Sequence, residues 1–234
     1  KRQNFFFFSS YKNIDLNDSL LIHLSEKSDR NFVNNLDNNY IDKNKNFVSE
    51  IVKHYKKVIY LSSSAVYGYN GTKPYSEEDK TYQFDLYTKN KLTIEKIILK
   101  NNGLVIRLSN VLGNNKKKNI INDIISQINK NKIILKNIDT TIDFIDIRDV
   151  TKVIDECILN NLKGIYNLGS GNGIKTIDLV KKILKINNKN NKEIIQRDNV
   201  SRKTFNVLNV NKIKKELNWK PKYDLEQSIL NYAK

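Results

Sequence analysis

The chain alternates short apolar runs with longer segments in which apolar residues recur at helical spacing. Four of the runs are rich in leucine and β-branched residues and are bounded by polar turns, which is typical of buried strands. These predicted strands cover residues 19–25, 57–63, 103–109 and 164–170. The helical period predicts helices over residues 47–55, 86–100, 120–129, 150–160 and 176–186. This alternation predicts a doubly wound α/β fold, in which helices cover both faces of a parallel sheet.

The two halves of the chain are expected to differ. Beyond residue 110 the strand signals become sparser and the content of Asn and Lys rises. We therefore expect a domain boundary near residue 110. Two polar low-complexity stretches, DNNYIDKNKN (37–46) and NNKNNK (187–192), are expected to be loops.

The first residues carry signals of their own. The sequence starts with Lys1 and contains no methionine, which predicts a fragment or a processed chain. The apolar run FFFF at residues 5–8 is shorter than the roughly 7–15 residues of a signal-peptide core. We expect this run to form a buried strand.

Composition and charge narrow the class of protein. Hydrophobic residues make up 39% of the 234 residues, and no apolar run approaches the roughly 20 residues of a membrane span. The net charge of +16 would suit nucleic acid, but the lysines are scattered along the chain instead of clustered. We expect neither nucleic acid nor membrane as a partner, while an anionic small substrate remains compatible. Cys157 is the single cysteine, so no intrachain disulfide can form and a cytoplasmic location is expected.

The two histidines do not indicate a metal site. His23 and His54 are separated by a strand and a helix, and no cysteine or further histidine stands at ligand spacing. His23 lies within a predicted strand and is expected to be a core residue. We expect no bound metal.

A tyrosine and a lysine open the helix predicted over residues 86–100. Tyr87 and Lys91 are four residues apart, so they share one helical face. A free tyrosine ionises near pH 10, so acid–base work at neutrality requires a cation that stabilises the phenolate. Lys91 is a candidate for that cation. With 12 tyrosines in a lysine-rich chain, chance also produces such pairs.

A serine-rich turn follows the strand predicted over residues 57–63. In VIYLSSSAVYG (58–68), the strand runs into Ser62, Ser63 and Ser64. Ligands of open parallel sheets bind at the carboxyl ends of the strands, where these hydroxyls would be presented. A serine there can hydrogen-bond a sugar or carbonyl oxygen and share a proton with a tyrosine. The alternative is a serine-rich turn that caps a helix.

Eight segments of the chain stand in the order of one known family. The first four are LLIHLSE, similar to V-I-H-L-A-A; VIYLSSSAVYG, similar to the serine strand; PYSEED, similar to P-x-S-E-x-D; and YTKNK, which fits Tyr-x-x-x-Lys. The other four are VIRLSNVLG, DFIDIRDVTKVI, IYNLGSGNGIKTIDLV and the closing LNVNKIKKELNWKPKYDLEQSI. Together they resemble the extended short-chain dehydrogenases/reductases, the NAD-dependent epimerases and dehydratases of nucleotide sugars.

The resemblance implies a partial NAD(P)-binding Rossmann-like domain over residues 1–110. It implies a mainly substrate-binding region over residues 111–234, some of whose segments return to the Rossmann core. It also implies NAD or NADP as cofactor, a nucleotide sugar as substrate, and a homodimer. It gives Tyr87 the role of general acid and base. It makes Lys91 the residue that binds the nicotinamide ribose and stabilises the tyrosine phenolate. Ser63, four residues before Tyr67, is the implied hydroxyl partner, with Ser64 as the alternative.

The resemblance also implies binding residues outside this group. Leu24 and Ser25, at the end of the first strand, would contact the cofactor. Asn110 would contact the substrate near its diphosphate. Ile142 stands where the family often has an arginine that holds the phosphates, so Arg197, Arg202 or Lys203 would supply that charge instead.

Two departures from the family pattern bear on activity. The 4,6-dehydratases of the family carry Asp-Glu where this chain has Ser64 and Ala65, which disfavours dehydration. No glycine precedes Gly68, so the sequence lacks the Gly-x-x-Gly-x-x-Gly turn through which a backbone approaches the cofactor pyrophosphate. GSGNG (169–173) follows a late strand and has the wrong spacing to replace that turn. We therefore expect this chain to bind NAD poorly.

Three functions remain open at this point. The first is a nucleotide-sugar epimerase that uses transient hydride transfer with Tyr, Lys and Ser acid–base catalysis. The second is a 4-keto nucleotide-sugar reductase. The third is a non-catalytic member that binds a nucleotide sugar or a protein partner. Ser63, Tyr87 and Lys91 favour catalysis, whereas Ile142 and the missing glycine turn favour the third function.

Overall fold

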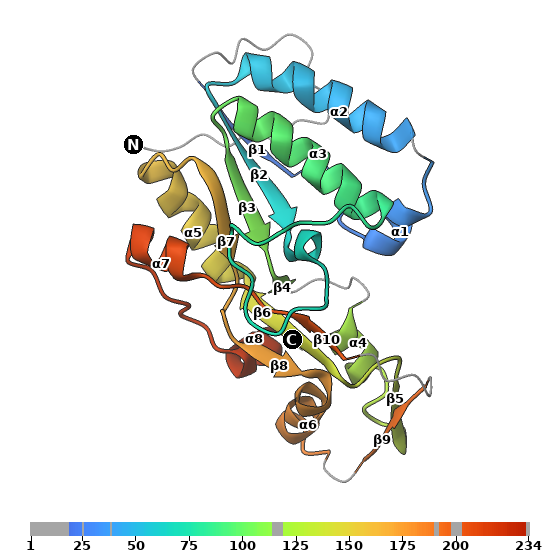
Figure 1. The fold of residues 1–234 in the computed structure, drawn as a ribbon. Coiled ribbons are helices and arrows are strands. Elements are labelled where there is room, and N and C mark those ends of the chain that lie inside the picture. The colour runs from blue at the N-terminus through green and yellow to red at the C-terminus, as the bar shows by residue number, and fades with distance from the viewer. Residues whose placement is uncertain are drawn as a thin grey trace.

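The computed structural model of the protein describes residues 19–24, 26–37, 39–113, 119–189, 192–197 and 203–232. One sheet and its helices form the upper part of Figure 1, and smaller sheets with further helices form the lower part. The strand expected at residues 5–8 lies outside the described residues. Among the described residues, no helix is both long and apolar enough to cross a bilayer.

A four-stranded parallel sheet forms the core of the upper part. In spatial order, its strands are β1 (Leu20–His23), β2 (Lys57–Ser63), β3 (Leu104–Leu108) and β7 (Gly164–Leu168). The register places Leu21 beside Val58 and Ile59 beside Leu104. All four strands expected from the sequence are confirmed, because short apolar runs bounded by turns mark buried parallel strands well.

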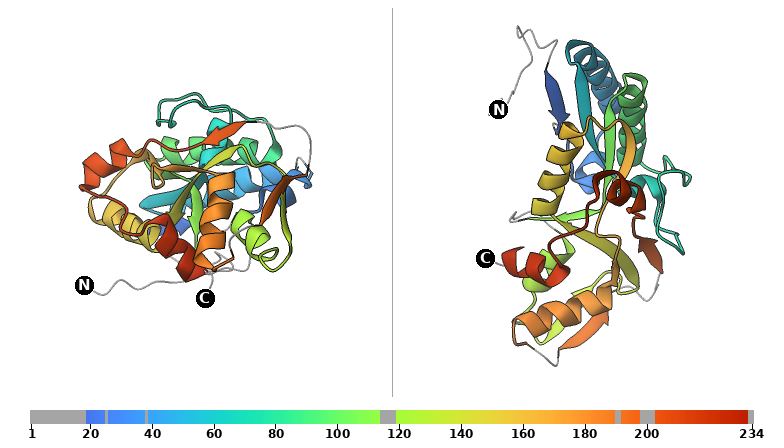
Figure 2. Two further views of the ribbon diagram at one scale, coloured as in Figure 1. Left: turned by 90° about the horizontal axis from the view of Figure 1, so that it is seen from below. Right: turned by 90° about the vertical axis from the view of Figure 1, so that its left-hand side faces the viewer.

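Helices cover both faces of this sheet, as Figures 1 and 2 show. On one face lie α2 (Asn39–Ile51) and α3 (Leu86–Lys100), and Ile94 and Ile98 of α3 pack with Val58 and Tyr60 of β2. On the other face lies α5 (Ile147–Leu159), whose buried residues pack with Ile59. Successive residues of β2 therefore enter two different cores, which explains why the strand is apolar on both sides. The doubly wound α/β prediction is confirmed.

The loop expected at residues 37–46 is wrong, because α2 begins at Asn39. Ile41, Val48 and Ile51 are buried at helical spacing, and Asn44 on the same face donates a hydrogen bond to Asn90 of α3 (3.1 Å). The many Asn and Lys residues concealed this stripe. Packing against α3 stabilises α2, whose composition alone would not make it helical.

The lower part contains six strands that the sequence pattern did not predict. A second sheet joins β10 (Thr204–Asn206), β6 (Thr140–Asp146) and β4 (Asn110–Leu112), with β8 (Gly173–Lys175) antiparallel to β6; separately, β5 (Lys132–Leu135) pairs with β9 (Glu193–Gln196). The expectation of sparser strands beyond residue 110 is therefore wrong. Five of these strands have only three or four residues, and pairing over long sequence separations defines them.

Further helices complete the structure. They are α4 (Ile120–Ile125), α6 (Thr176–Ile186) and α8 (Leu225–Tyr232) in the lower part, α7 (Asn211–Leu217) beside β7, and α1 (Arg30–Asn34) beside α3. The sequence predicted α4 and α6 but missed α1, α7 and α8. The missed helices are short, and α1 and α7 contain only two apolar residues each, whereas the equally short α4 contains four isoleucines.

Asp143 of β6 joins the lower sheet to the end of β7. Its carboxylate accepts hydrogen bonds from the backbone N–H groups of Ser170 (2.9 Å), Gly171 (3.3 Å) and Leu208 (3.3 Å), and from the Ser170 hydroxyl. A side chain at Gly169 would collide with this carboxylate. Burial raises the pKa of Asp143 to about 6. Residues of the segment GSGNG (169–173) therefore surround the buried carboxylate of Asp143.

Candidate active site

The helix α3 carries Tyr87 and Lys91. It begins with a capping box, in which the Asp85 carboxylate accepts from the Thr88 backbone N–H (2.8 Å) and the Thr88 hydroxyl accepts from the Asp85 backbone N–H (3.2 Å). This cap fixes the start of the helix two residues before Tyr87. Tyr87 and Lys91 are buried, 8% and 6% exposed, and the Lys91 ammonium nitrogen lies 5.8 Å from the centre of the Tyr87 ring.

The serine turn follows β2 as the 3₁₀ helix η2 (Ser64–Tyr67). Ser64 is buried and donates a hydrogen bond to the side chain of Asn206 (2.6 Å). Ser63 is half-buried and caps η2, with its Oγ accepting from the Ala65 backbone N–H (3.2 Å). The alternative of a helix cap is therefore confirmed for Ser63, whose contact with a substrate stays a prediction.

A carboxylate that the sequence reasoning missed lies against Lys91. Glu26 follows β1, and its Oε2 lies 2.8 Å from the Lys91 ammonium and accepts a hydrogen bond from the Tyr60 hydroxyl (2.6 Å). Both charged side chains are almost fully buried. One signal was available, since Glu26 stands at the end of LLIHLSE, where V-I-H-L-A-A has alanine.

Burial controls the ionisation of the groups around this pair. The pKa of Tyr60 is raised by burial and by the neighbouring carboxylate of Glu26. Burial lowers the pKa of His23, although Glu26 acts in the opposite direction. His23 is therefore a core residue, as expected, and stays neutral near pH 7.

A second buried ion pair supports the end of β2. The Glu95 carboxylate of α3 accepts from the Arg107 guanidinium of β3 (2.7 Å) and from the Ser62 hydroxyl. Arg107 also donates to the Tyr67 hydroxyl (2.9 Å), which donates onward to the Asn167 side chain (2.7 Å). The network ties α3, β3 and η2 together, so the serine turn and α3 keep a fixed relative position.

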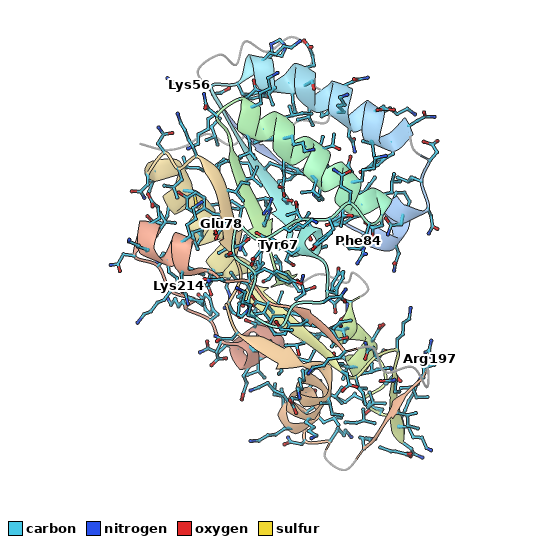
Figure 3. The ribbon with its side chains drawn as sticks, viewed as in Figure 1. Lys56, Tyr67, Glu78, Phe84, Arg197 and Lys214 are labelled. Carbon is cyan, nitrogen blue, oxygen red and sulfur yellow. The ribbon has the colours of Figure 1, made fainter. Side chains whose placement is uncertain are left out.

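A cleft of about 900 Å³ opens beside this arrangement, and we call it the aromatic cleft. Its lining residues include Arg30, Tyr67, Tyr69, Tyr75, Lys80, Tyr82, Phe84 and Thr204. Tyr69 also packs in the apolar cluster that contains Tyr87. Figure 3 shows Phe84 and Tyr67 where the upper and lower parts of the molecule meet. The cleft therefore borders the helix that carries Tyr87.

The other residues predicted to form the site are spread more widely. Leu24 follows β1 and is 62% exposed, whereas Ser25 and Arg202 lie outside the described residues. Asn110 begins β4 and is exposed, and its side chain donates to the backbone carbonyl of Asp143 (3.2 Å). Arg197 follows β9, far from Tyr67 and Phe84 in Figure 3. Tyr87 and Lys91 therefore share one face of α3, which packs against β2 and η2, the two elements that meet at Ser63, whereas Arg197 lies apart.

The residues near Lys91 fit one end of a dinucleotide. Among the described residues Lys91 donates to Glu26 and to the Leu61 carbonyl (3.1 Å), so its third N–H is available to a ribose hydroxyl. Residues 1–67 contain no glycine, so none of them supplies a glycine-rich turn for the pyrophosphate. For metals, the described residues contain no group of three or more His, Cys, Asp or Glu side chains that could hold an ion.

Solved structures with this fold include several sugar-nucleotide enzymes. RMD from Pseudomonas aeruginosa in complex with NADPH has a TM-score of 0.82 at 21% identity, covering 91% of this chain and 79% of that one. UDP-glucose 4-epimerase from Thermotoga maritima with UDP-glucose has a TM-score of 0.79 at 18% identity, covering 91% and 75%. dTDP-glucose 4,6-dehydratase from Bacillus anthracis with NAD has a TM-score of 0.76 at 23% identity, covering 91% and 70%. At these identities the likeness establishes the fold.

The sequence itself places the chain in a family. No curated protein matches it significantly. The model of the NAD dependent epimerase/dehydratase family, however, matches residues 19–169, a segment that runs from just before β1 through the serine turn, Tyr87 and Lys91 to the end of β7. The chain therefore belongs to the NAD dependent epimerase/dehydratase family of enzymes.

Proposed function

We propose that the protein is an NAD(P)-dependent epimerase of nucleotide sugars. The proposal rests on the position of Tyr87 and Lys91, which lie on one face of α3. This helix packs against β2 and the serine turn. Parallel sheets of this kind bind ligands at the carboxyl ends of their strands, which is where the turn lies.

Each residue has a role in this chemistry. The Tyr87 phenolate takes the proton of a sugar hydroxyl as that carbon is oxidised, and the resulting phenol returns the proton when the carbonyl is reduced. The Ser63 hydroxyl donates a hydrogen bond to the same sugar oxygen, since Ser64 is committed to Asn206. Lys91 supplies positive charge near the Tyr87 phenol. NAD supplies the hydride acceptor and donor for the two half-reactions.

Three further points support an epimerase. Solved relatives of the same fold bind UDP-glucose and NAD. Ser64 and Ala65 stand where the family's 4,6-dehydratases carry Asp-Glu, so this chain lacks the extra acid and base that dehydration needs. The aromatic cleft beside Tyr87 offers ring faces and hydroxyl groups to a sugar. A cytoplasmic homodimer completes the proposal.

The experiment is an interconversion assay on the full natural protein, with NAD and a panel of UDP- and dTDP-hexoses, read by NMR of the sugar. We expect one epimer pair to interconvert. Tyr87→Phe should lower turnover by about 10²-fold or more, the usual contribution of a positioned acid–base group. Tyr223→Phe, in the segment before α8, should leave turnover unchanged. Equal turnover in the Tyr87→Phe variant would refute the role of Tyr87.

A non-catalytic family member is the second candidate, and the Glu26–Lys91 pair favours it. Glu26 neutralises the charge of Lys91, the cation that would stabilise the Tyr87 phenolate. In that case, calorimetry should show a nucleotide sugar binding with equal affinity to the wild type and to Tyr87→Phe, with no turnover in either. The reductase alternative would instead show oxidation of NADPH with a 4-keto nucleotide sugar.

A further inference from the structure

Side chains of the short helix α1 form hydrogen bonds with the first residues of α3 and with its N-cap. Asp85, the N-cap of α3, divides its two oxygens between two tasks. Its Oδ1 accepts from the Thr88 backbone N–H and hydroxyl, which caps the helix. Its Oδ2 accepts from Arg30 Nε (2.6 Å) and from the Asn34 amide (3.0 Å), both on α1. The cap and the clamp therefore use different atoms of one carboxylate.

Asn34 reaches Tyr87 directly. Its side-chain oxygen accepts the backbone N–H of Tyr87 (2.9 Å). That N–H lies in the first turn of α3, where no intrahelical acceptor exists. The backbone of Tyr87 is therefore held by a side chain from a helix 53 residues earlier in the chain.

Arg30 joins this clamp to the aromatic cleft. Its guanidinium carbon lies 5.1 Å from the centre of the Tyr69 ring and 4.9 Å from that of Phe84, and its NH1 donates to the Tyr69 hydroxyl (2.7 Å). All three side chains line the cleft, and that of Arg30 remains 34% exposed. Burial alone would raise the pKa of Asp85, but hydrogen bonds from Thr88, Asn34 and Arg30 lower it, so the pair stays charged.

We propose that Arg30 is a positioning residue for Tyr87: it locks the N-cap of α3 to the wall of the aromatic cleft, with Asn34 as its partner. The inference rests on the proposed function. Neither residue touches the reacting atoms. A planar guanidinium is required because its several N–H groups bridge a carboxylate and a phenol hydroxyl while its face lies near two rings that contact each other, which an ammonium cannot do.

Hydrogen exchange of the backbone amides tests the clamp without any cofactor. In Arg30→Gln, the amide of Tyr87 should exchange about tenfold faster, while that of Thr88, still capped by Asp85 Oδ1, and those of β2 and β3 should not change. Asp85→Ser keeps an N-cap but removes the acceptor of Arg30, so it should expose the Tyr87 amide while Thr88 stays protected. Lys27→Gln, which removes another cation facing an aromatic ring of α1, should change neither. Unchanged exchange in Arg30→Gln would overturn the proposal.

Kinetics separate positioning from simple stability. In Arg30→Gln, kcat should fall about tenfold with KM nearly constant, because a displaced Tyr87 spoils the reacting geometry. Arg30→Lys should not restore kcat. A change in KM alone would make Arg30 a substrate contact and overturn the inference. If exchange changes as expected but Tyr87→Phe has no effect on turnover, the clamp stands and the proposed function fails.

Discussion

Lys91 and Glu26 form a buried ion pair at the end of the sheet, with 2.8 Å between Nζ and Oε2 and side chains only 7% and 6% exposed. The Tyr60 hydroxyl donates to the same carboxylate oxygen, and the Lys91 ammonium lies 4.8 Å from the centre of the Tyr60 ring. The lysine that the family resemblance assigns to the cofactor thus already has a carboxylate partner. Any ligand that binds Lys91 must share it with Glu26.

The contribution of the Glu26–Lys91 ion pair to the free energy of unfolding can be measured by mutation. Glu26→Gln leaves the Lys91 ammonium buried without a countercharge, and we expect a loss of about 3–5 kcal/mol. Lys91→Met combined with Glu26→Gln should recover much of that loss, because no uncompensated charge remains. Urea denaturation of the four proteins in this cycle gives the coupling free energy. Additive losses would show that the two groups do not interact.

The pair Glu95–Arg107 should contribute to stability in the same way. Its side chains are 2% and 5% exposed, so Glu95→Gln strands the Arg107 guanidinium and should cost about 3–5 kcal/mol. The matched control is Glu193→Gln, which breaks an exposed pair with Lys132 and should have little effect because solvent screens it. Thermal unfolding of the two variants compares them directly. Similar melting temperatures would contradict the buried network.

Acid should destabilise the protein through His23. Burial lowers the pKa of His23 in the folded state, so below the ordinary value of 6.5 the unfolded state binds more protons. The stability that neutral His23 contributes is therefore complete above pH 6.5 and is lost as pH falls from 6.5 toward the lowered value. His23→Gln should flatten the pH dependence of unfolding between pH 5 and 6.5. His54→Gln, at the exposed end of the 3₁₀ helix η1 (Val52–His54), should leave it unchanged.

Cys157 should report on unfolding. It is fully buried in α5, and burial raises the pKa of its thiol to about 12 despite the nearby charge of Lys57. A thiolate is the reactive form, so the folded protein should not react with an aromatic disulfide reagent at pH 8. One thiol per chain should react once urea unfolds it. Rapid reaction without denaturant would mean that α5 opens locally.

Much of the fold was predictable because its signals are local. The spacing of apolar residues predicts a helix over residues 86–100, which are the bounds of α3, and Asp85 is its N-cap. A spacing of four places Tyr87 and Lys91 on one face whatever else surrounds them. The four strands of the main sheet are buried on both sides, so each is a continuous apolar run that needs no partner to be recognised.

The rest was decided by contacts between distant residues. Glu26 meets Lys91 across 65 positions, and Arg30 meets Asp85 across 55. In the lower sheet, β4, β8 and β10 have three residues each and are defined by their pairing with β6. The sequence by itself determined the helices and strands with strong local periods and the spacing of Tyr87 and Lys91. The tertiary structure alone decided which charges neutralise one another and what holds Tyr87, because hydrogen bonds and ion pairs depend on distance in space and not on spacing along the chain.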